Sequence, residues 1–246
     1  MHLLARLATI ALGCILLERD AAAGELVTDI NIVTALDISD SVDSQAAAIE
    51  IDGMAEAIRS PRVMAAVKSG HHRRIGFAIF AWRDGAYPEL VSWTIIASAE
   101  DAHAVSRRLR SDFHAFAAAD PPAPPLSPHM TDLSGAIDHA AILLLTAPFT
   151  ARRSVINVIG NGWDNVGEGP LHARDRFVAT GGTINGVVLG FDPVLMDYYR
   201  GNVVGGPGAF VLSVEQPSQM ADVLARKFLN DIALQDQPEQ LARSLR

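Results

Sequence analysis

The chain has 246 residues, 49% of them hydrophobic, and a formal net charge of −8 at pH 7. This composition is sufficient for a sizeable core and excludes global disorder. The negative balance argues against binding to nucleic acid, because a phosphate backbone selects basic surfaces.

The first element in chain order is a short apolar run. Arg6 precedes the run at residues 7–17, and residues 21–23 are three alanines, which is the pattern of a secretory signal peptide. The run is too short to span a bilayer as a stable helix. We therefore expect residues 1–23 to be a signal peptide, with an uncleaved anchor as the alternative. The mature chain is then periplasmic or secreted, with no stable membrane span.

The only cysteine, Cys14, lies inside this run. The residues before it fit a lipoprotein signal poorly, so lipidation is the less favoured interpretation. Cleavage near Ala23 leaves a mature chain with no cysteine and no disulfide. Such a chain is held together by its core alone, as a domain of this size can be.

Apolar runs and helical periodicities alternate along the rest of the chain. Predicted strands cover residues 30–36, 75–82, 89–95, 154–159, 183–189 and 209–214. Predicted helices cover residues 42–59, 61–68, 98–116, 131–147, 169–179, 193–200 and 217–229. A turn at residues 84–85 makes the second and third strands a hairpin, and five prolines within residues 120–128 predict an extended loop.

This order of elements predicts an α/β fold. Strands that alternate with helices favour a doubly wound, mostly parallel six-stranded sheet with helices on both faces. The hairpin adds one antiparallel edge strand, which is common in such sheets. No internal repeat or linker divides the chain, so we expect one domain over residues 24–231 and a polar tail over residues 232–246.

Oxygen-bearing side chains gather where the first predicted strand ends. Asp37, Ser39 and Ser41 form an Asp-x-Ser-x-Ser run. The carboxyl ends of parallel strands meet at one edge, so the loops with Thr131 and residues 160–165 should converge there. A carboxylate and hydroxyls suit Mg²⁺ or Mn²⁺, with Ca²⁺ as a further option, better than zinc. The alternative is that Ser41 and Thr131 simply cap helices.

The Asp-x-Ser-x-Ser run with a downstream threonine resembles the metal-ion-dependent adhesion site of von Willebrand factor type A (vWA) domains. The chain resembles still more closely a bacterial group of exported, vWA-like proteins known as domain of unknown function 1194. That resemblance covers about residues 27–231. Its motifs lie at residues 35–43, 74–76, 82, 91–94, 152–156, 184–186, 198–200 and 204–210.

The resemblance implies a set of metal ligands: Asp37, Ser39, Ser41, Thr131 and Asn161. The family's third loop carries Gly-Asp-Gly, whereas residues 160–162 here are Gly-Asn-Gly. Asn161 keeps an oxygen but loses the charge, so we expect weaker cation binding. Asp164 is a candidate to compensate. Trp163 and Asp164 are also candidate partner contacts, with plain packing as the alternative for Trp163.

The function that this resemblance implies is recognition. A cation with few carboxylate ligands is under-neutralised and can accept a carboxylate from a protein partner with an exposed acidic residue. One alternative is a metal-independent scaffold of the same fold, and a third is an uncharacterised hydrolase that uses Asp37 and a nearby histidine. An enzyme is less favoured because the sequence lacks a Gly-x-Ser-x-Gly elbow, a phosphate-binding loop and a His-Glu-x-x-His motif.

Overall fold

The computed structural model describes residues 26–38, 44–82, 85–118 and 131–233. The predicted signal peptide, Ser39, Ser41, the proline-rich loop and residues 234–246 of the predicted tail lie outside these ranges. The strands are β1 (Val27–Thr28), β2 (Asn31–Asp37), β3 (Ile75–Trp82), β4 (Glu89–Ile96), β5 (Thr150–Ala151), β6 (Ser154–Gly160), β7 (Thr183–Leu189) and β8 (Val211–Val214). The helices are α1 (Ser44–Arg59), α2 (Pro61–Ser69), α3 (Ala99–Ala118), α4 (Leu133–Leu145), α5 (Pro170–Ala179), α6 (Pro193–Tyr198) and α7 (Met220–Ala233).

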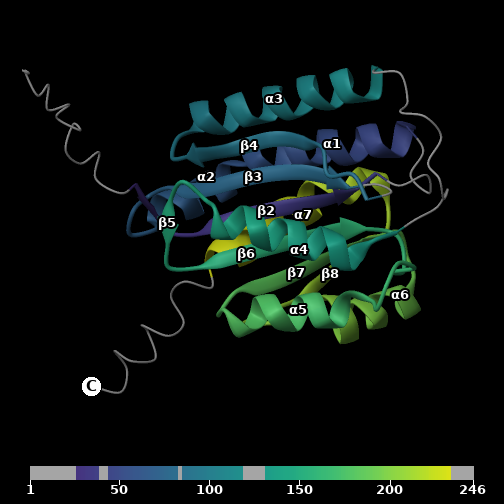
Figure 1. The fold of residues 1–246 in the computed structure, drawn as a ribbon. Coiled ribbons are helices and arrows are strands. Elements are labelled where there is room, and N and C mark those ends of the chain that lie inside the picture. Colours follow the sequence, from purple (N-terminus) through teal and green to yellow (C-terminus); the bar gives the residue numbers. More distant parts are fainter. Residues whose placement is uncertain (1–25, 39–43, 83–84, 119–130, 234–246) are drawn as a thin grey trace, which may run out of the picture.

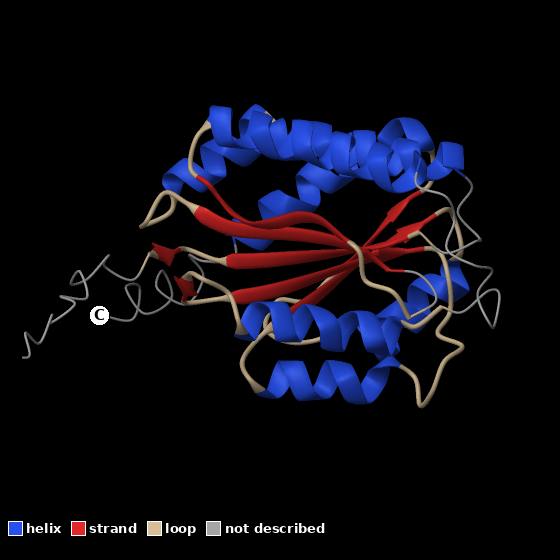
Figure 2. Cartoon of the chain, turned by 45° about the horizontal axis from the view of Figure 1, so that its top comes forward, coloured by secondary structure: helices blue, strands red, loops and turns tan. Residues whose placement is uncertain are grey.

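The main sheet has six strands in the order β4-β3-β2-β6-β7-β8. Neighbouring strands are parallel except for the β3–β4 pair, which is antiparallel and forms one edge. Helices cover both faces (Figures 1 and 2). The predicted fold class is therefore confirmed. The structure adds a small parallel pair, β1 with β5, whose strands of two residues are too short to show a sequence period.

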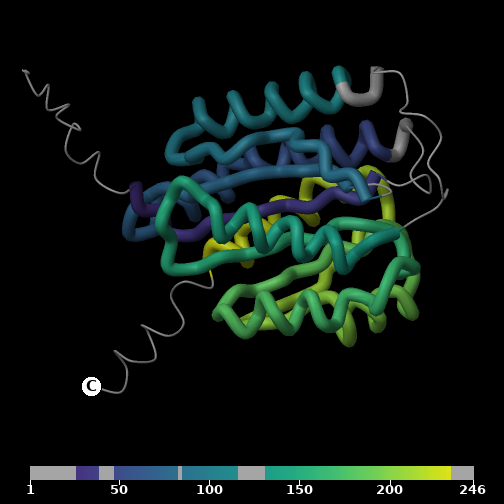
Figure 3. Tube along the Cα trace, in the orientation of Figure 1, coloured from purple at the N-terminus to yellow at the C-terminus, as the bar shows by residue number. Residues whose placement is uncertain are grey.

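Strand β2 lies in the middle of the sheet and is buried along its whole length (Figure 3). Its alternate side chains enter two different cores, because successive side chains of a strand point to opposite faces. Ile32 and Leu36 pack in the core that α1, α3 and α7 cover. Val33 and Ala35 pack in the core that α4 and α5 cover. A run buried on both faces explains the continuous apolar sequence of this strand.

The connections of the sheet change direction between β2 and β6. The helix that follows β2 is α1, which packs on one face, whereas the helix that follows β6 is α5, which packs on the other. In doubly wound sheets this divergence leaves a crevice beyond the carboxyl ends of the two strands, and ligands bind there. Asp37 ends β2 and Gly160 ends β6, so both residues lie at this switch point.

Several helix ends differ from the prediction by a few residues, and two of these differences have a clear physical reason. The cap of α4 is Asp132, whose carboxylate accepts a hydrogen bond from the Gly135 amide, so the expectation that Thr131 opens and caps this helix is wrong. The last helix continues to Ala233, beyond the predicted end at residue 229. The helix continues because Asp231 is buried and Ile232 packs in the core.

Candidate metal centre

Asp37 occupies the carboxyl end of the central strand. Its side chain is completely buried, and it faces Trp82 of β3 across the ladder. Gly160 of β6 lies against it: a Cβ on Gly160 would sit 3.0 Å from Asp37 Oδ2. A glycine within a strand often marks such a close approach. The acidic side chain therefore fills space that any larger residue at position 160 would need.

Thr131 is held in place by the loop that follows β6. The Asn165 side-chain oxygen accepts a hydrogen bond from the Thr131 amide at 2.8 Å, and the Asn165 amide donates to the Thr131 carbonyl at 3.0 Å. Asp164 Oδ1 accepts hydrogen bonds from the amides of Leu133 and Ser134 at 2.7 and 3.3 Å. Asp164 thus holds the start of α4, a role that its position in the sequence did not reveal.

Two glycines bring the predicted ligands together. A Cβ on Gly162 would lie 3.1 Å from Thr131 Oγ1, just as a Cβ on Gly160 would contact Asp37. Asn161 lies between these glycines and is half-buried. Asp37 and Thr131 therefore pack on glycines that lie two residues apart in the chain, with Asn161 between them. Ser39 and Ser41 lie outside the described residues.

Glu50 is a second carboxylate that the sequence interpretation missed. It belongs to α1 and is only 6% exposed. Burial and, to a smaller extent, the negative charge of Asp37 together raise its pKa to about 8. The signal in the sequence was its spacing, because Glu50 falls on the same helical face as the buried residues Ala47 and Met54.

Two buried donors adjoin Asp37. Tyr199 Oη and Trp82 Nε1 have no hydrogen-bond partner within the described ranges. Tyr199 Oη lies 3.1 Å from the position of a Gly160 Cβ, the same position that approaches Asp37 Oδ2. Burial, and then the charge of Asp37, raise the pKa of Tyr199 above its ordinary value. Buried polar groups normally find partners, so this is a place where a bound water would satisfy such donors.

A family model described as "Protein of unknown function (DUF1194)" matches residues 27–236. The chain belongs to this family. No curated protein matches its sequence. The family match covers the whole central sheet and all three loops at the switch point, including the Gly-Asn-Gly segment.

Solved structures with the same fold are vWA domains and related proteins. The vWF domain of the type V pili tip protein Mfa5 from Porphyromonas gingivalis has a TM-score of 0.56 at 10% identity, covering 82% of this DUF1194 chain and 95% of that chain. A von Willebrand factor type A structure from Catenulispora acidiphila gives 0.53 at 12% identity, covering 82% and 42%. Proximal thread matrix protein 1 from the mussel byssus gives 0.51 at 15%, covering 85% and 49%, so the chain spans about half of that protein. These likenesses establish the vWA fold.

The donors of the DUF1194 site fit a hard, oxygen-coordinated cation. Carboxylates come from Asp37 and Glu50, a hydroxyl from Thr131 and an amide oxygen from Asn161. Mg²⁺ and Mn²⁺ favour such ligands, whereas zinc in proteins favours thiolate and imidazole. The described residues contain no group of three or more His, Cys, Asp or Glu placed to hold an ion. A cation at this point would therefore need the hydroxyl of Thr131 and the amide oxygen of Asn161 as well as the acids.

Exposed apolar side chains accompany this edge of the DUF1194 domain. Trp163 is 44% exposed and its ring packs on Tyr198, with the ring centroids 4.6 Å apart. Phe191, after β7, and Val194, in α6, are also exposed. One part of the Trp163 surface therefore packs on Tyr198, and the rest is exposed to solvent.

A cavity of about 710 Å³ lies elsewhere, between α4 and α5. Its walls include Ile142 and Leu145 of α4 and Phe177 of α5. The lining contains neither Asp37 nor Thr131. The candidate metal centre is accordingly separate from this apolar hollow.

Proposed function

We propose that this chain is an exported vWA-like binding module that recognises a protein partner through a divalent cation. Mg²⁺ or Mn²⁺ is the expected ion, with Ca²⁺ as a further option. The proposed ligands are Asp37, Ser39, Ser41, Thr131 and Asn161. The observation that carries the proposal is the packing of Gly160 on Asp37 and of Gly162 on Thr131, because it draws separate loops to one point.

The chemistry of recognition follows from the charges. A dication beside Asp37 and neutral ligands keeps a net positive charge, and an open coordination position then attracts a carboxylate. The ion supplies that electrostatic attraction when it is bound. The protein orients its own oxygens, and the two glycines leave room for the ligand side chains at the strand ends. A partner with an exposed acidic residue is the ligand that this arrangement favours.

Trp163 extends the proposed contact beyond the ion. Its exposed ring follows Gly162 directly in the chain, and Gly162 packs on Thr131. Tryptophan is enriched among the residues that contribute most to protein interfaces. We expect Trp163 to contact apolar groups of the partner next to the acidic residue. Asp164 contributes by holding the start of α4 in place, and its contact with a partner is a further proposal.

Export is part of the proposal and rests on the N-terminal sequence. Residues 7–17 form the apolar centre of the predicted signal peptide. None of the helices within the described ranges is both long and apolar enough to cross a bilayer. The proposed location of the mature chain is the periplasm or the external medium.

A metal-independent scaffold of the same fold is the second candidate. Asn161 favours it, because the loss of a carboxylate from the third loop weakens the attraction for a cation. The described residues add no observation in favour of the hydrolase alternative.

A pull-down of exported proteins with and without chelator tests the proposal. The native chain should capture a partner with Mg²⁺ present and lose it in chelator. Asp37→Ala and the isosteric Asp37→Asn should not capture it in either condition. Asp138→Ala is the matched control, since Asp138 is an exposed acid of α4 that pairs with Arg176. Equal capture by the native chain in chelator would favour the scaffold.

A further inference from the structure

We infer that Glu50 supplies the second negative charge of the cation site and replaces the carboxylate that the third loop lacks. The inference rests on the proposed function, because it concerns the same cation. It assigns the role to a residue of α1, outside all three loops that carry the predicted ligands.

The position of Glu50 makes the role possible. Residues 38–43 connect Asp37 to the start of α1, and Glu50 lies in the second turn of that helix. It lies on the inner face of the helix, with Ala47, Ile51 and Met54, which all pack toward the sheet. A charged residue on such a face is rare unless it is paired or binds an ion.

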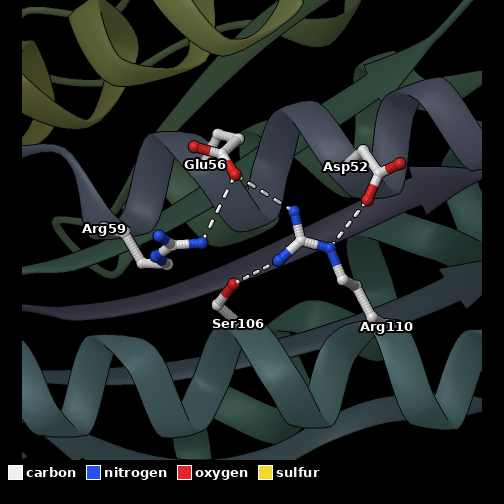
Figure 4. A network of polar contacts seen from close by, with 5 residues as sticks. All are labelled: Asp52, Glu56, Arg59, Ser106 and Arg110. Atoms are coloured by element: carbon white, nitrogen blue, oxygen red, sulfur yellow. Dashed lines mark hydrogen bonds and ion pairs between the residues drawn. The ribbon is translucent and has the colours of Figure 1, made fainter.

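Other acids of α1 show what ordinary pairing looks like (Figure 4). Asp52 and Glu56 lie on the side that faces α3, and Arg110 of α3 pairs with both, at 2.7 and 3.2 Å. Arg59 adds a second partner for Glu56 at 3.3 Å. Glu50 has no such partner within the described residues. Its charged neighbour is Asp37, which is also negative.

The two buried acids account for the charge that the third loop does not provide. Asn161 is neutral, so without Glu50 the described ligands would offer one carboxylate to a dication. Glu50 brings the total to two, and a cation between two acids relieves the repulsion between them. Within the described residues no lysine or arginine pairs with Glu50, so the geometry leaves its carboxylate available to a cation.

The buried hydroxyl of Tyr199 is an independent sign of a ligand. It is completely buried, has no hydrogen-bond partner in the described part of the chain, and approaches the same point above Gly160 as Asp37. A hydrated cation offers that hydroxyl a partner.

Calorimetric titration with Mn²⁺ tests the inference. Glu50→Gln should weaken Mn²⁺ binding by about tenfold or more, because ligand charge tunes dication affinity strongly. Glu56→Gln removes the same charge from the same helix and should change the affinity by less than about twofold, since exposed charges are screened. Adding Asn161→Asp to Glu50→Gln should restore most of the lost affinity, which a purely structural role of Glu50 would not explain.

The outcomes of this titration distinguish the proposed cation dependence from the proposed role of Glu50. No Mn²⁺ binding by the native chain would overturn the proposed cation dependence itself. Native binding that Glu50→Gln leaves unchanged would overturn the role of Glu50 and leave the proposed function standing. Thermal melting in chelator checks that the variant folds: Glu50→Gln should melt no lower than the native chain, because glutamine matches glutamate in size and requires no charge to be buried. If Glu50→Gln weakened binding and Asn161→Asp did not restore it, the inference would also fail.

Discussion

Two buried acidic centres lie against the same sheet, and they differ in the charged groups that neighbour their carboxylates. Near the middle of the sheet, Asp231 of α7 pairs with Lys227 at 2.6 Å and accepts hydrogen bonds from Asn157 and Asn185. Both members of the ion pair are completely buried. At the carboxyl end of the strands, Asp37 and Glu50 are also buried, yet the charge that acts on Glu50 is another acid.

This difference in neighbouring charge distinguishes an interior ion pair from a candidate binding site. The chain devotes one of its two lysines to Asp231, so that centre is neutralised from within. Under the proposed function, the centre at the strand ends is neutralised instead by a cation from solvent. The proposal thus distinguishes a structural acid, which has its own lysine, from acids at the switch point that would bind an external ion.

Removal of the Lys227 charge should have the largest effect on stability. Lys227→Met leaves Asp231 buried without its partner, and we expect a loss of about 3–5 kcal/mol in the free energy of unfolding. Urea denaturation measures it. The double variant with Asp231→Asn should regain part of the loss, because no buried charge is then left unpaired. A loss below about 1 kcal/mol for the single variant would contradict the assigned role of this pair.

Gly160→Ala should have the next largest effect on stability, and it acts at the acidic centre that contains Asp37. The new Cβ would lie 3.0 Å from Asp37 Oδ2 and 3.1 Å from Tyr199 Oη. Overpacking of this kind destabilises by about 1–3 kcal/mol, and displacement of Asp37 should weaken Mn²⁺ binding as well. Gly201→Ala is the control, since nothing lies within 4 Å of its Cβ position. Equal stability and Mn²⁺ affinity in both variants would argue against a tight contact at Asp37.

Charge pairs on the surface should matter less than either buried centre. Arg110→Met removes the pairs with Asp52 and Glu56, whose side chains are well exposed. We expect a loss of no more than about 1 kcal/mol in the free energy of unfolding. High salt should shrink that loss further, because it screens exposed charges. Denaturation at low and high salt gives both values, and a loss as large as that of Lys227→Met would erase the distinction between the surface and the interior.

The smallest expected effect is on the tyrosines, which should ionise at a higher pH in the folded chain than in the unfolded chain. The chain has three, and the pKa of each is raised, mainly by burial: Tyr87 to about 12, with Tyr198 and Tyr199 also above the ordinary value. At about pH 10 the folded chain should show little tyrosinate absorbance, whereas the unfolded chain is half ionised. Because the folded pKa values are higher, this contribution to stability is lost as pH rises through them. Early ionisation of all three would contradict the burial of Tyr199 beside Asp37.

Most of the fold was predictable because it depends on local patterns. The apolar run of β2, the Asp-Gly turn and the glycines after α5 indicate strands and turns directly, and their alternation selects the α/β class. The pair β1–β5 was not predictable, since two-residue strands have no period. The end of α7 was mistaken because Asp231 looks like a surface residue until its contact with Lys227 is known.

The candidate site was predictable where its residues adjoin strand ends. Asp37, Thr131 and Asn161 follow from the order of elements and the family resemblance. The proposed role of Glu50 and the approach of Tyr199 to Asp37 were not, because both residues belong to helical segments whose orientation depends on tertiary packing. The two hydrogen bonds between Asn165 and Thr131 were equally unpredictable, since they join two loops that are far apart in sequence.

The most direct measurement of the central claim counts the bound ions. Electron paramagnetic resonance of free Mn²⁺, recorded during titration of the native chain and of Asp37→Asn, gives the number bound per molecule. The expected result is a single ion for the native chain and none for the variant. A native chain that binds no ion, or a variant that still binds one, would contradict a cation site at Asp37.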